Sequence, residues 1–185
     1  IPSFLATILI PFNNPTISSG EAFKLKSSKS MYFPLGITKE TLKNLINTAH
    51  ENNVSFISDE IYHGIQYENN PTTALEITDK CYVINSFSKY FSMTGWRIGW
   101  MIVPEDHVRQ VERLSQNLFI YPPHVSQLTA LSAMDADIEL NENVNVYKKN
   151  REILLEELPK AGLEKFSPPD GAFYIYVDIS KYSND

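Results

Sequence analysis

The sequence predicts an α/β fold, because short apolar runs alternate with stretches that carry apolar residues at helical spacing. Three of the apolar runs are typical of buried strands: Val54–Ser58, Cys81–Asn85 and Ile98–Val103. Polar residues follow these runs directly, and in open α/β sheets ligands bind outside the carboxyl ends of the strands. We therefore expect a mainly parallel sheet with ligand-binding side chains gathered at one edge.

The remaining elements follow in chain order. Ala6–Pro11 is expected to be a short strand, and Thr38 can cap a helix over Lys39–Asn52 because its hydroxyl can accept a backbone hydrogen bond. Residues 17–36 are rich in Ser and Lys without a clear period, which indicates a loop or an insertion. Further along, the patterns predict three helices and a late strand: Glu105–Leu118, Ser126–Met134, Asn141–Leu158 and Ala172–Ile179.

The composition excludes several classes of protein. Hydrophobic residues make up 43% and charged residues 21% of the 185 residues, which favours a soluble globular protein over a disordered one. The net charge is -6 and no basic stripe is visible, so nucleic acid is not an expected partner. No apolar run reaches the roughly 18 residues of a membrane-spanning helix. Cys81 is the single cysteine, which suits a cytoplasmic location, and the four histidines lack metal-ligand spacing.

The stretch from Ser86 to Trp100 carries the strongest chemical signal. It places two hydroxyls, the Lys89 amine and the Arg97 guanidinium around a turn that contains a glycine. Hydroxyls and arginine suit a phosphate, and a nearby cation disfavours the ammonium form of a lysine and so favours a nucleophilic amine. An isolated motif of this kind is most often only a surface lysine beside a turn. Here, however, Asp59 and Tyr62 follow an earlier strand and are expected at the same sheet edge.

Three segments resemble the signature segments of the class I/II (fold-type I) aminotransferases, which depend on pyridoxal phosphate (PLP): Asn13–Thr16, Ser58–Tyr62 and Ser86–Gly99. Gly171–Tyr174 resembles the strand that lies early in the small domain of this family. The resemblance implies an incomplete large domain like that of aspartate aminotransferase over residues 1–135, with 17–36 as an insertion. It also implies that residues 136–185 begin an α+β small domain.

The resemblance implies a role for each matching residue. Lys89 would carry PLP as a Schiff base and shuttle a proton between the substrate and the cofactor. Asp59 would pair with the pyridine nitrogen. The remaining cofactor contacts would go to the phenolic oxygen, from Tyr62 and Asn14, and to the phosphate, from Ser86, Ser88 and Arg97. One departure is Ile17, which stands where the family normally has a glycine.

These features leave three functions open. The first is transamination between an amino acid and a 2-oxo acid, in a protein that is expected to be a homodimer. The second is a PLP-dependent C–S β-lyase reaction on the same scaffold. The third is a non-enzymatic module, either an inactive gene remnant or the effector-sensing domain of a transcription regulator. The chain is also expected to be part of a longer protein and, expressed alone, to be poorly stable and inactive.

Overall fold

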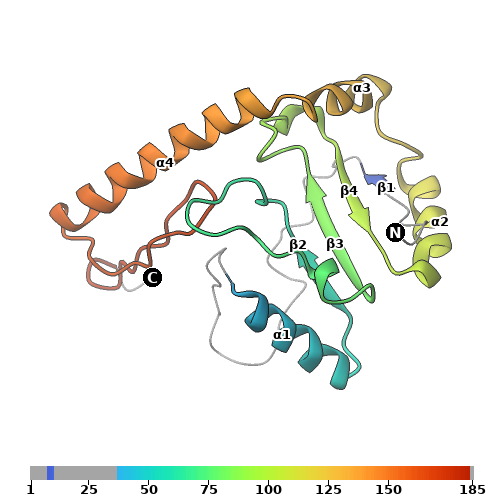
Figure 1. Cartoon of the computed structure of the whole chain (residues 1–185), viewed down its shortest axis with the longest axis horizontal. Helices are drawn as coiled ribbons and strands as arrows, with labels where there is room; N and C mark the ends of the chain where they lie inside the picture. Colours follow the sequence, from blue (N-terminus) through green and yellow to red (C-terminus); the bar gives the residue numbers. More distant parts are fainter. Residues whose placement is uncertain (1–7, 11–36, 184–185) are drawn as a thin grey trace.

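The computed structural model describes residues 8–10 and 37–183, and its centre is a four-stranded sheet (Figure 1). The strands lie in the order β1-β4-β3-β2. Their bounds are β1 Ile8–Ile10, β2 Phe56–Asp59, β3 Cys81–Ser86 and β4 Gly99–Ile102. The strands predicted from the apolar runs are therefore present, each shifted by no more than two residues at either end.

The α/β class is confirmed, but the described sheet is mixed rather than mainly parallel. Only β2 and β3 run parallel, whereas β4 is antiparallel to both β3 and β1. The reason is that the chain folds back directly after β3. The Phe87 amide donates to the Ile98 carbonyl at 3.2 Å, and the Met93 amide donates to the Phe87 carbonyl at 3.0 Å.

This reversal brings three strand ends to one edge of the sheet. Asp59, the last residue of β2, is in register with Ile84 in β3. Ser86, the last residue of β3, is in register with Gly99, the first residue of β4. The residues that follow β2 and β3, and those that precede β4, must therefore lie close together, although β4 runs in the opposite direction.

The first helix, α1 (Lys39–Glu51), begins where the sequence predicts. The Thr38 hydroxyl accepts a hydrogen bond from the Thr41 amide at 3.2 Å and so caps the helix. The helix packs onto the sheet through a cluster of five buried residues: Leu42, Ile46, Ala74, Cys81 and Val83. The first two belong to α1, and the last two belong to β3. Burial, reinforced by Glu60 and Asp79, raises the pKa of the Cys81 thiol to about 11, so this thiol is a neutral core group.

A second cluster lies under α3 (His124–Ala133) and includes Phe87, Met93, Ile98 and Ala130. Short 3₁₀ helices occur at Ala74–Glu76, Thr94–Trp96 and Glu105–His107. The last of these is continued by α2 (Val108–Leu118), so the predicted helix from Glu105 starts with a tighter turn. No residue of α2 is buried.

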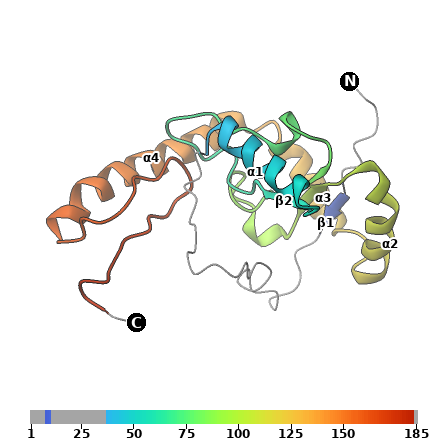
Figure 2. The ribbon, with the colours of Figure 1, turned by 90° about the horizontal axis from the view of Figure 1, so that it is seen from below.

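The longest helix, α4 (Asp137–Lys160), extends away from the sheet, and residues 161–183 run back alongside it (Figure 1, Figure 2). It exceeds the predicted helix at both ends and stops before Gly162, which has a φ of +85°. The proposed boundary between the two domains at 135/136 falls in the turn before α4 and stays a prediction.

The predicted strand over Ala172–Ile179 is wrong. This stretch makes only an isolated bridge, Phe166 with Val177, next to a second one between Gln66 and Gly171. A strand needs a neighbouring strand to satisfy its backbone, and Ala172 has a φ of +59°, which interrupts extended structure. The alternation of side chains alone therefore misled the prediction.

Asn14 and the whole 17–36 segment lie outside the described residues, so the role predicted for Asn14 and the insertion predicted over 17–36 stay predictions. Within the described part of the chain, no helix is both long enough and apolar enough to cross a lipid bilayer.

Candidate active site

Lys89 lies in the turn that follows β3. Its carbonyl accepts a hydrogen bond from the Ser92 amide at 3.0 Å, which closes the turn, and Ser92 has a φ of +56°. The half-buried Lys89 amine lies 5.6 Å from the centroid of the Tyr62 ring and 5.6 Å from that of Phe173. Residues far apart in the sequence thus meet around one amine.

Two buried serines precede the half-buried Lys89. The Ser86 hydroxyl donates to the Ile98 carbonyl at 3.0 Å and accepts from the Ser88 amide at 3.0 Å. The Ser86 hydroxyl also donates to the Ser88 hydroxyl oxygen at 2.9 Å, so its single proton is shared between two acceptors and the Ser88 proton is not used. The Thr94 hydroxyl donates to the Ser88 carbonyl at 2.7 Å. Ser86 therefore fixes the backbone of the turn, while Ser88 keeps donor capacity next to the lysine.

Arg97 adds a fixed positive charge at the same sheet edge. Its backbone is left-handed, with φ +53° and ψ +49°, a conformation that is uncommon for a side chain of this size. One guanidinium nitrogen donates to the Thr94 carbonyl at 2.6 Å. The Ser126 hydroxyl donates to the Trp96 carbonyl at 2.8 Å and ties this turn to α3. Strained residues that the surroundings hold in place are concentrated at functional sites.

Asp59 ends β2, and one of its carboxylate oxygens accepts a hydrogen bond from the Ile61 amide at 3.2 Å. The next residue, Glu60, is 5% exposed and organises the loop. One of its oxygens accepts hydrogen bonds from three donors: the Ser58 hydroxyl at 2.9 Å, the Thr73 hydroxyl at 3.1 Å and the Ala74 amide at 2.9 Å. Asp59 therefore stays available, while Glu60 is fully used by the fold.

Tyr62 packs edge-on against two aromatic rings from the segment after α4. Its ring centroid lies 5.6 Å from Phe173 and 5.5 Å from Tyr174. Burial raises the pKa of Tyr62, and the nearby Tyr174, Asp59 and Tyr176 raise it further. The phenol, which the ordinary tyrosine pKa of about 10 already keeps protonated at neutral pH, therefore becomes a still weaker acid and can donate a hydrogen bond to an anionic oxygen.

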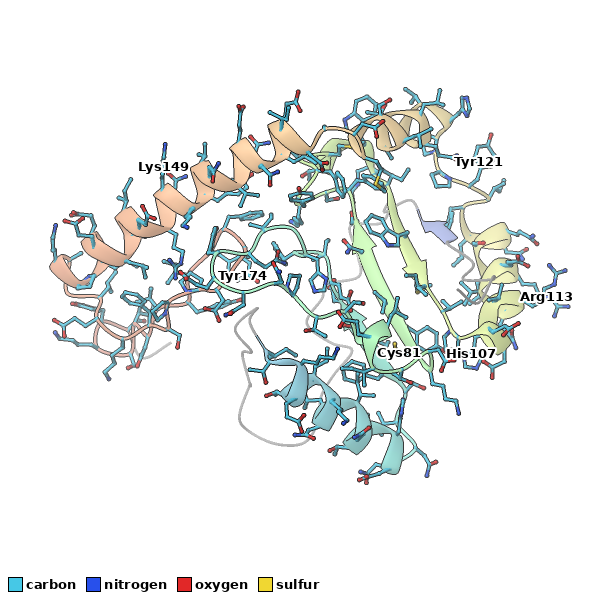
Figure 3. All side chains as sticks on the ribbon, viewed as in Figure 1. Cys81, His107, Arg113, Tyr121, Lys149 and Tyr174 are labelled. Carbon is cyan, nitrogen blue, oxygen red and sulfur yellow. The ribbon has the colours of Figure 1, made fainter. Side chains whose placement is uncertain are left out.

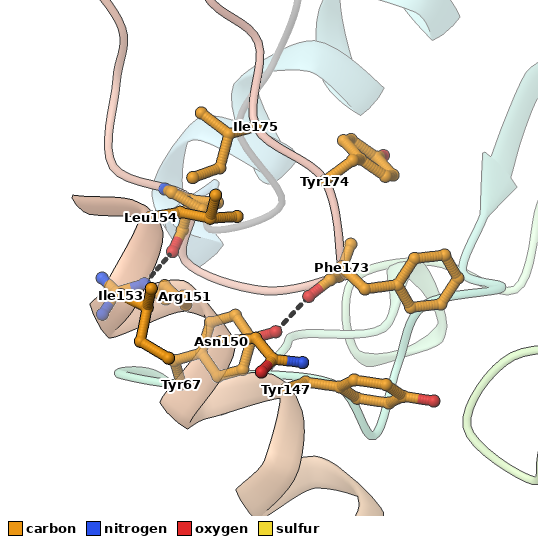
Figure 4. A pocket seen from close by; sticks show the side chains of 11 residues that line it. Tyr67, Tyr147, Asn150, Arg151, Ile153, Leu154, Phe173, Tyr174 and Ile175 are labelled. Carbon is orange, nitrogen blue, oxygen red and sulfur yellow. Dashed lines mark hydrogen bonds between the residues drawn. The ribbon is translucent and has the colours of Figure 1, made fainter. Parts of the chain in front are cut away.

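Two hollows lie near these residues. One, of about 320 Å³, is lined by Asp59, Tyr62 and Tyr174 together with residues at the start of α1. The other, of about 390 Å³, lies between α4 and the segment around Phe173 (Figure 4). Neither hollow includes Lys89. Tyr174 lies between α4 and the sheet (Figure 3). Cys81 and His107 lie at the end of the sheet where β3 begins, away from the end that leads to Lys89.

The sequence did not predict roles for Phe173, Tyr174, Glu60 or Thr94. Phe173 and Tyr174 stand in a segment whose resemblance to the family was noted, but spacing alone cannot show that it folds back over Lys89. Glu60 is adjacent to Asp59, and only burial separates a structural carboxylate from an available one. Among the described residues, no group of three His, Cys, Asp or Glu side chains could hold a metal ion.

The donor set at this edge fits PLP chemically. The cofactor has an aldehyde, a basic pyridine nitrogen, a phenolic oxygen and a phosphate. An amine, a carboxylate, a protonated phenol and a hydroxyl with a guanidinium offer a matching group for each: Lys89, Asp59, Tyr62, and Ser88 with Arg97.

Comparison with known proteins gives a consistent result. The sequence profile of the family described as aminotransferase class I and II matches residues 35–185. The chain is 41% identical over 153 residues to the valine–pyruvate aminotransferase of Mycobacterium tuberculosis, covering 80% of this chain and 39% of that protein. It is 32% identical over 185 residues to a probable aspartate aminotransferase of Methanocaldococcus jannaschii, covering 96% of this chain and 45% of that protein.

Solved structures agree. A provisionally assigned aminotransferase from Silicibacter pomeroyi superposes with a TM-score of 0.78 at 60% identity. An aminotransferase from M. tuberculosis superposes with a TM-score of 0.76 at 40% identity. Each covers 80% of this chain, and the chain spans 40% of each of them. The chain therefore belongs to the class I and II aminotransferases, a family of PLP-dependent enzymes of fold type I.

Proposed function

We propose that this chain carries the cofactor-binding core of an enzyme that transfers an amino group between an amino acid and a 2-oxo acid. The observation that carries the proposal is the position of the Lys89 amine, 5.6 Å from both the Tyr62 and Phe173 ring centroids, at the sheet edge where β2 and β3 end. PLP, when bound there, supplies an electron-withdrawing ring that stabilises negative charge at the substrate's α-carbon.

Lys89, Asp59 and Tyr62 would each contact a different part of the cofactor. Lys89 would provide the primary amine that holds the cofactor covalently, and the same amine would move a proton to or from the substrate's α-carbon. Asp59 would accept a charge-assisted hydrogen bond from the protonated pyridine nitrogen and so keep that nitrogen protonated. Tyr62 would donate to the phenolic oxygen, since its phenol, like that of any tyrosine, is protonated at neutral pH and its raised pKa makes it a still weaker acid.

The phosphate would be held by Ser88 and Arg97. The Ser86 hydroxyl donates its proton to the Ile98 carbonyl, so Ser86 would act mainly by shaping the turn that presents Ser88. Arg97 offers a planar guanidinium with several donors, which suits phosphate oxygens. The amino acid and 2-oxo acid would bind over Lys89, and homodimerisation is part of the proposal.

The experiment that tests the cofactor site is covalent trapping. PLP is added to the chain, the linkage is made irreversible with borohydride, and the labelled lysine is identified by peptide mass spectrometry. We expect the label on Lys89 and its loss in Lys89→Arg. Lys80→Arg is the matched control, because Lys80 is exposed and stands at the other end of β3. Label on another lysine in the unsubstituted chain would refute the site.

The reaction is tested separately by product analysis. With PLP, an amino acid and a 2-oxo acid acceptor, transamination yields a new 2-oxo acid and a new amino acid in equal amounts. Pyruvate and ammonia formed from a sulfur amino acid without any acceptor would instead show the β-lyase reaction. Retention of the label on Lys89 without either product in the full-length parent protein would favour a non-enzymatic module.

A further inference from the structure

Arg151, in the middle of α4, makes contacts that the proposed chemistry does not use. Its side chain is 12% exposed although it lies on a helix whose other charged residues are mostly in solvent. The guanidinium Nε donates to the Pro169 carbonyl at 2.7 Å, and one terminal nitrogen lies 3.3 Å from a Glu68 carboxylate oxygen. The guanidinium carbon, Cζ, lies 5.4 Å from the centroid of the Tyr67 ring.

Tyr67 continues this set of contacts to the segment that carries Phe173 and Tyr174 (Figure 4). Its hydroxyl donates to the Ala172 carbonyl, and its amide donates to the Asp170 carbonyl at 2.9 Å. Burial raises the pKa of Tyr67 more than Arg151 lowers it, so the hydroxyl is a weaker acid than an ordinary tyrosine. The Ala172 amide in turn donates to the Ile65 carbonyl at 2.9 Å.

The two segments that are joined in this way are those that surround Lys89. The loop over residues 60–68 carries Tyr62, and residues 169–174 carry Phe173 and Tyr174. Phe173 lies next to the Lys89 amine, and both rings contact Tyr62. Phe173 and Tyr174 are 47% and 41% exposed, so packing around their own side chains holds them only weakly.

We propose that Arg151 is a positioning residue for the candidate active site: by joining Tyr67 to Pro169, it holds Phe173 and Tyr174 against Lys89 and Tyr62. The inference rests on the proposed function, because it assigns Arg151 a part in keeping PLP attached to Lys89. Side chains that fix a lysine and shield its cofactor linkage from water act only if their own support is rigid.

The test compares Arg151→Met with Arg151→Lys and Tyr67→Phe. Lys149→Met is the matched control: Lys149 is exposed on α4 (Figure 3). Two residues along a helix correspond to a rotation of roughly 200°, so Lys149 and Arg151 lie on different sides of α4. The first readout, without cofactor, is amide hydrogen exchange at Tyr67 and Ala172. We expect about tenfold faster exchange in Arg151→Met, the factor that corresponds to losing one hydrogen bond to a charged group.

The second readout is the PLP concentration that gives half-maximal borohydride labelling of Lys89. We expect it to rise about tenfold in Arg151→Met, in step with the exchange rate. Tyr67→Phe should raise it less, and Arg151→Lys should restore part of the loss, because lysine keeps the charge but not the planar fork. Lys149→Met should leave both readouts unchanged.

Each outcome has a defined meaning. Faster exchange at Ala172 with unchanged labelling of Lys89 would overturn the positioning role. Unchanged exchange in Arg151→Met would show that Arg151 does not hold the Tyr67 loop and the segment after Pro169 together. If Arg151→Met exposes the Cys81 thiol, which is buried under α1, the substitution has unfolded the chain, and Tyr67→Phe then decides. Absence of label on Lys89 in the unsubstituted chain would refute the proposed function, while exchange still decides whether Arg151 holds the segment.

Discussion

Glu60 is a buried carboxylate beside the candidate cofactor residues, and its neighbours show what it does. Three donors share one of its oxygens, and the other lies 3.3 Å from the His63 ring nitrogen Nδ1. A carboxylate with this many partners has a structural role, because it accepts hydrogen bonds from donors that would otherwise lack an acceptor. Asp59, which is adjacent in sequence but exposed, is therefore accessible to a bound cofactor.

At the residue scale, we therefore expect Glu60→Ala to lower the free energy of unfolding by about 3 kcal/mol, because it leaves several buried donors without an acceptor. Glu60→Gln keeps one acceptor oxygen and should cost clearly less. Urea titration of both variants measures the difference. Glu76→Ala is the matched control, since the exposed Glu76 pairs with an exposed Lys39 and should matter little. Equal losses in the two Glu60 variants would contradict this account.

A second prediction at this scale concerns pH and His63. Burial lowers the pKa of His63, and the nearby Glu60 opposes this shift only in part. The folded state therefore binds a proton less readily than the unfolded state, whose His pKa is about 6.5. The contribution of neutral His63 is complete above about pH 6.5 and is lost as the pH falls toward the lowered folded value.

We expect the unfolding free energy to rise with pH across this window and His63→Gln to flatten the rise. His124→Gln is the control, because His124 is exposed at the start of α3. Urea titrations between pH 5 and pH 7.5, roughly the range over which an imidazole titrates, provide the measurement. A slope of opposite sign that disappears in His63→Gln would show that the Glu60 interaction outweighs burial.

At the scale of elements, the contact between the loop over residues 60–68 and the segment after α4 depends on Gly171. A Cβ added at Gly171 would overlap the carbonyl oxygen of Ile65, whereas a Cβ at Gly95 would meet nothing. Backbone atoms cannot move aside as a side chain can, so the two segments would have to separate. The approach of Phe173 to Lys89 requires that they stay together.

We accordingly expect Gly171→Ala to destabilise the chain by about 1–3 kcal/mol, the usual cost of forcing an extra group into a packed contact. Gly95→Ala should be close to neutral. Thermal unfolding measures the stability, and amide exchange at Ala172 locates the effect. A Gly171→Ala variant with unchanged exchange at Ala172 would show that the loop contact is not tight in solution.

The same scale shows which elements the sequence could predict. The α1 start was predictable because Thr38 acts locally, on an amide three residues away. The residues around Lys89 were recognisable because Ser86 to Arg97 form one continuous motif. The position of Phe173 was not predictable, since it depends on long-range contacts between Tyr67, Arg151 and Ala172. The false strand at Ala172–Ile179 has the same origin, because pairing partners are not encoded in alternation.

At the scale of the whole molecule, large apolar side chains face solvent along α2, α3 and α4. Leu118 is 74% exposed, Leu131 is 69% exposed and Ile138 is 75% exposed, and no residue of α2 is buried. The chain spans 39% and 45% of the two curated relatives compared above. Single exposed apolar residues are ordinary, but several on adjoining helices favour association.

We therefore expect the 185-residue chain to self-associate at micromolar concentrations, because contact between these helices removes apolar surface from water. Replacing Leu118, Leu131 and Ile138 by Gln should shift the chain toward monomer in sedimentation velocity without changing its net charge. The control carries Glu142→Gln and Lys149→Gln, which also preserves net charge and alters the exposed surface of α4. If association is driven by apolar contact, raising the salt concentration should strengthen it. If it weakens with salt, charge pairing rather than α2, α3 and α4 apolar surface holds the copies together.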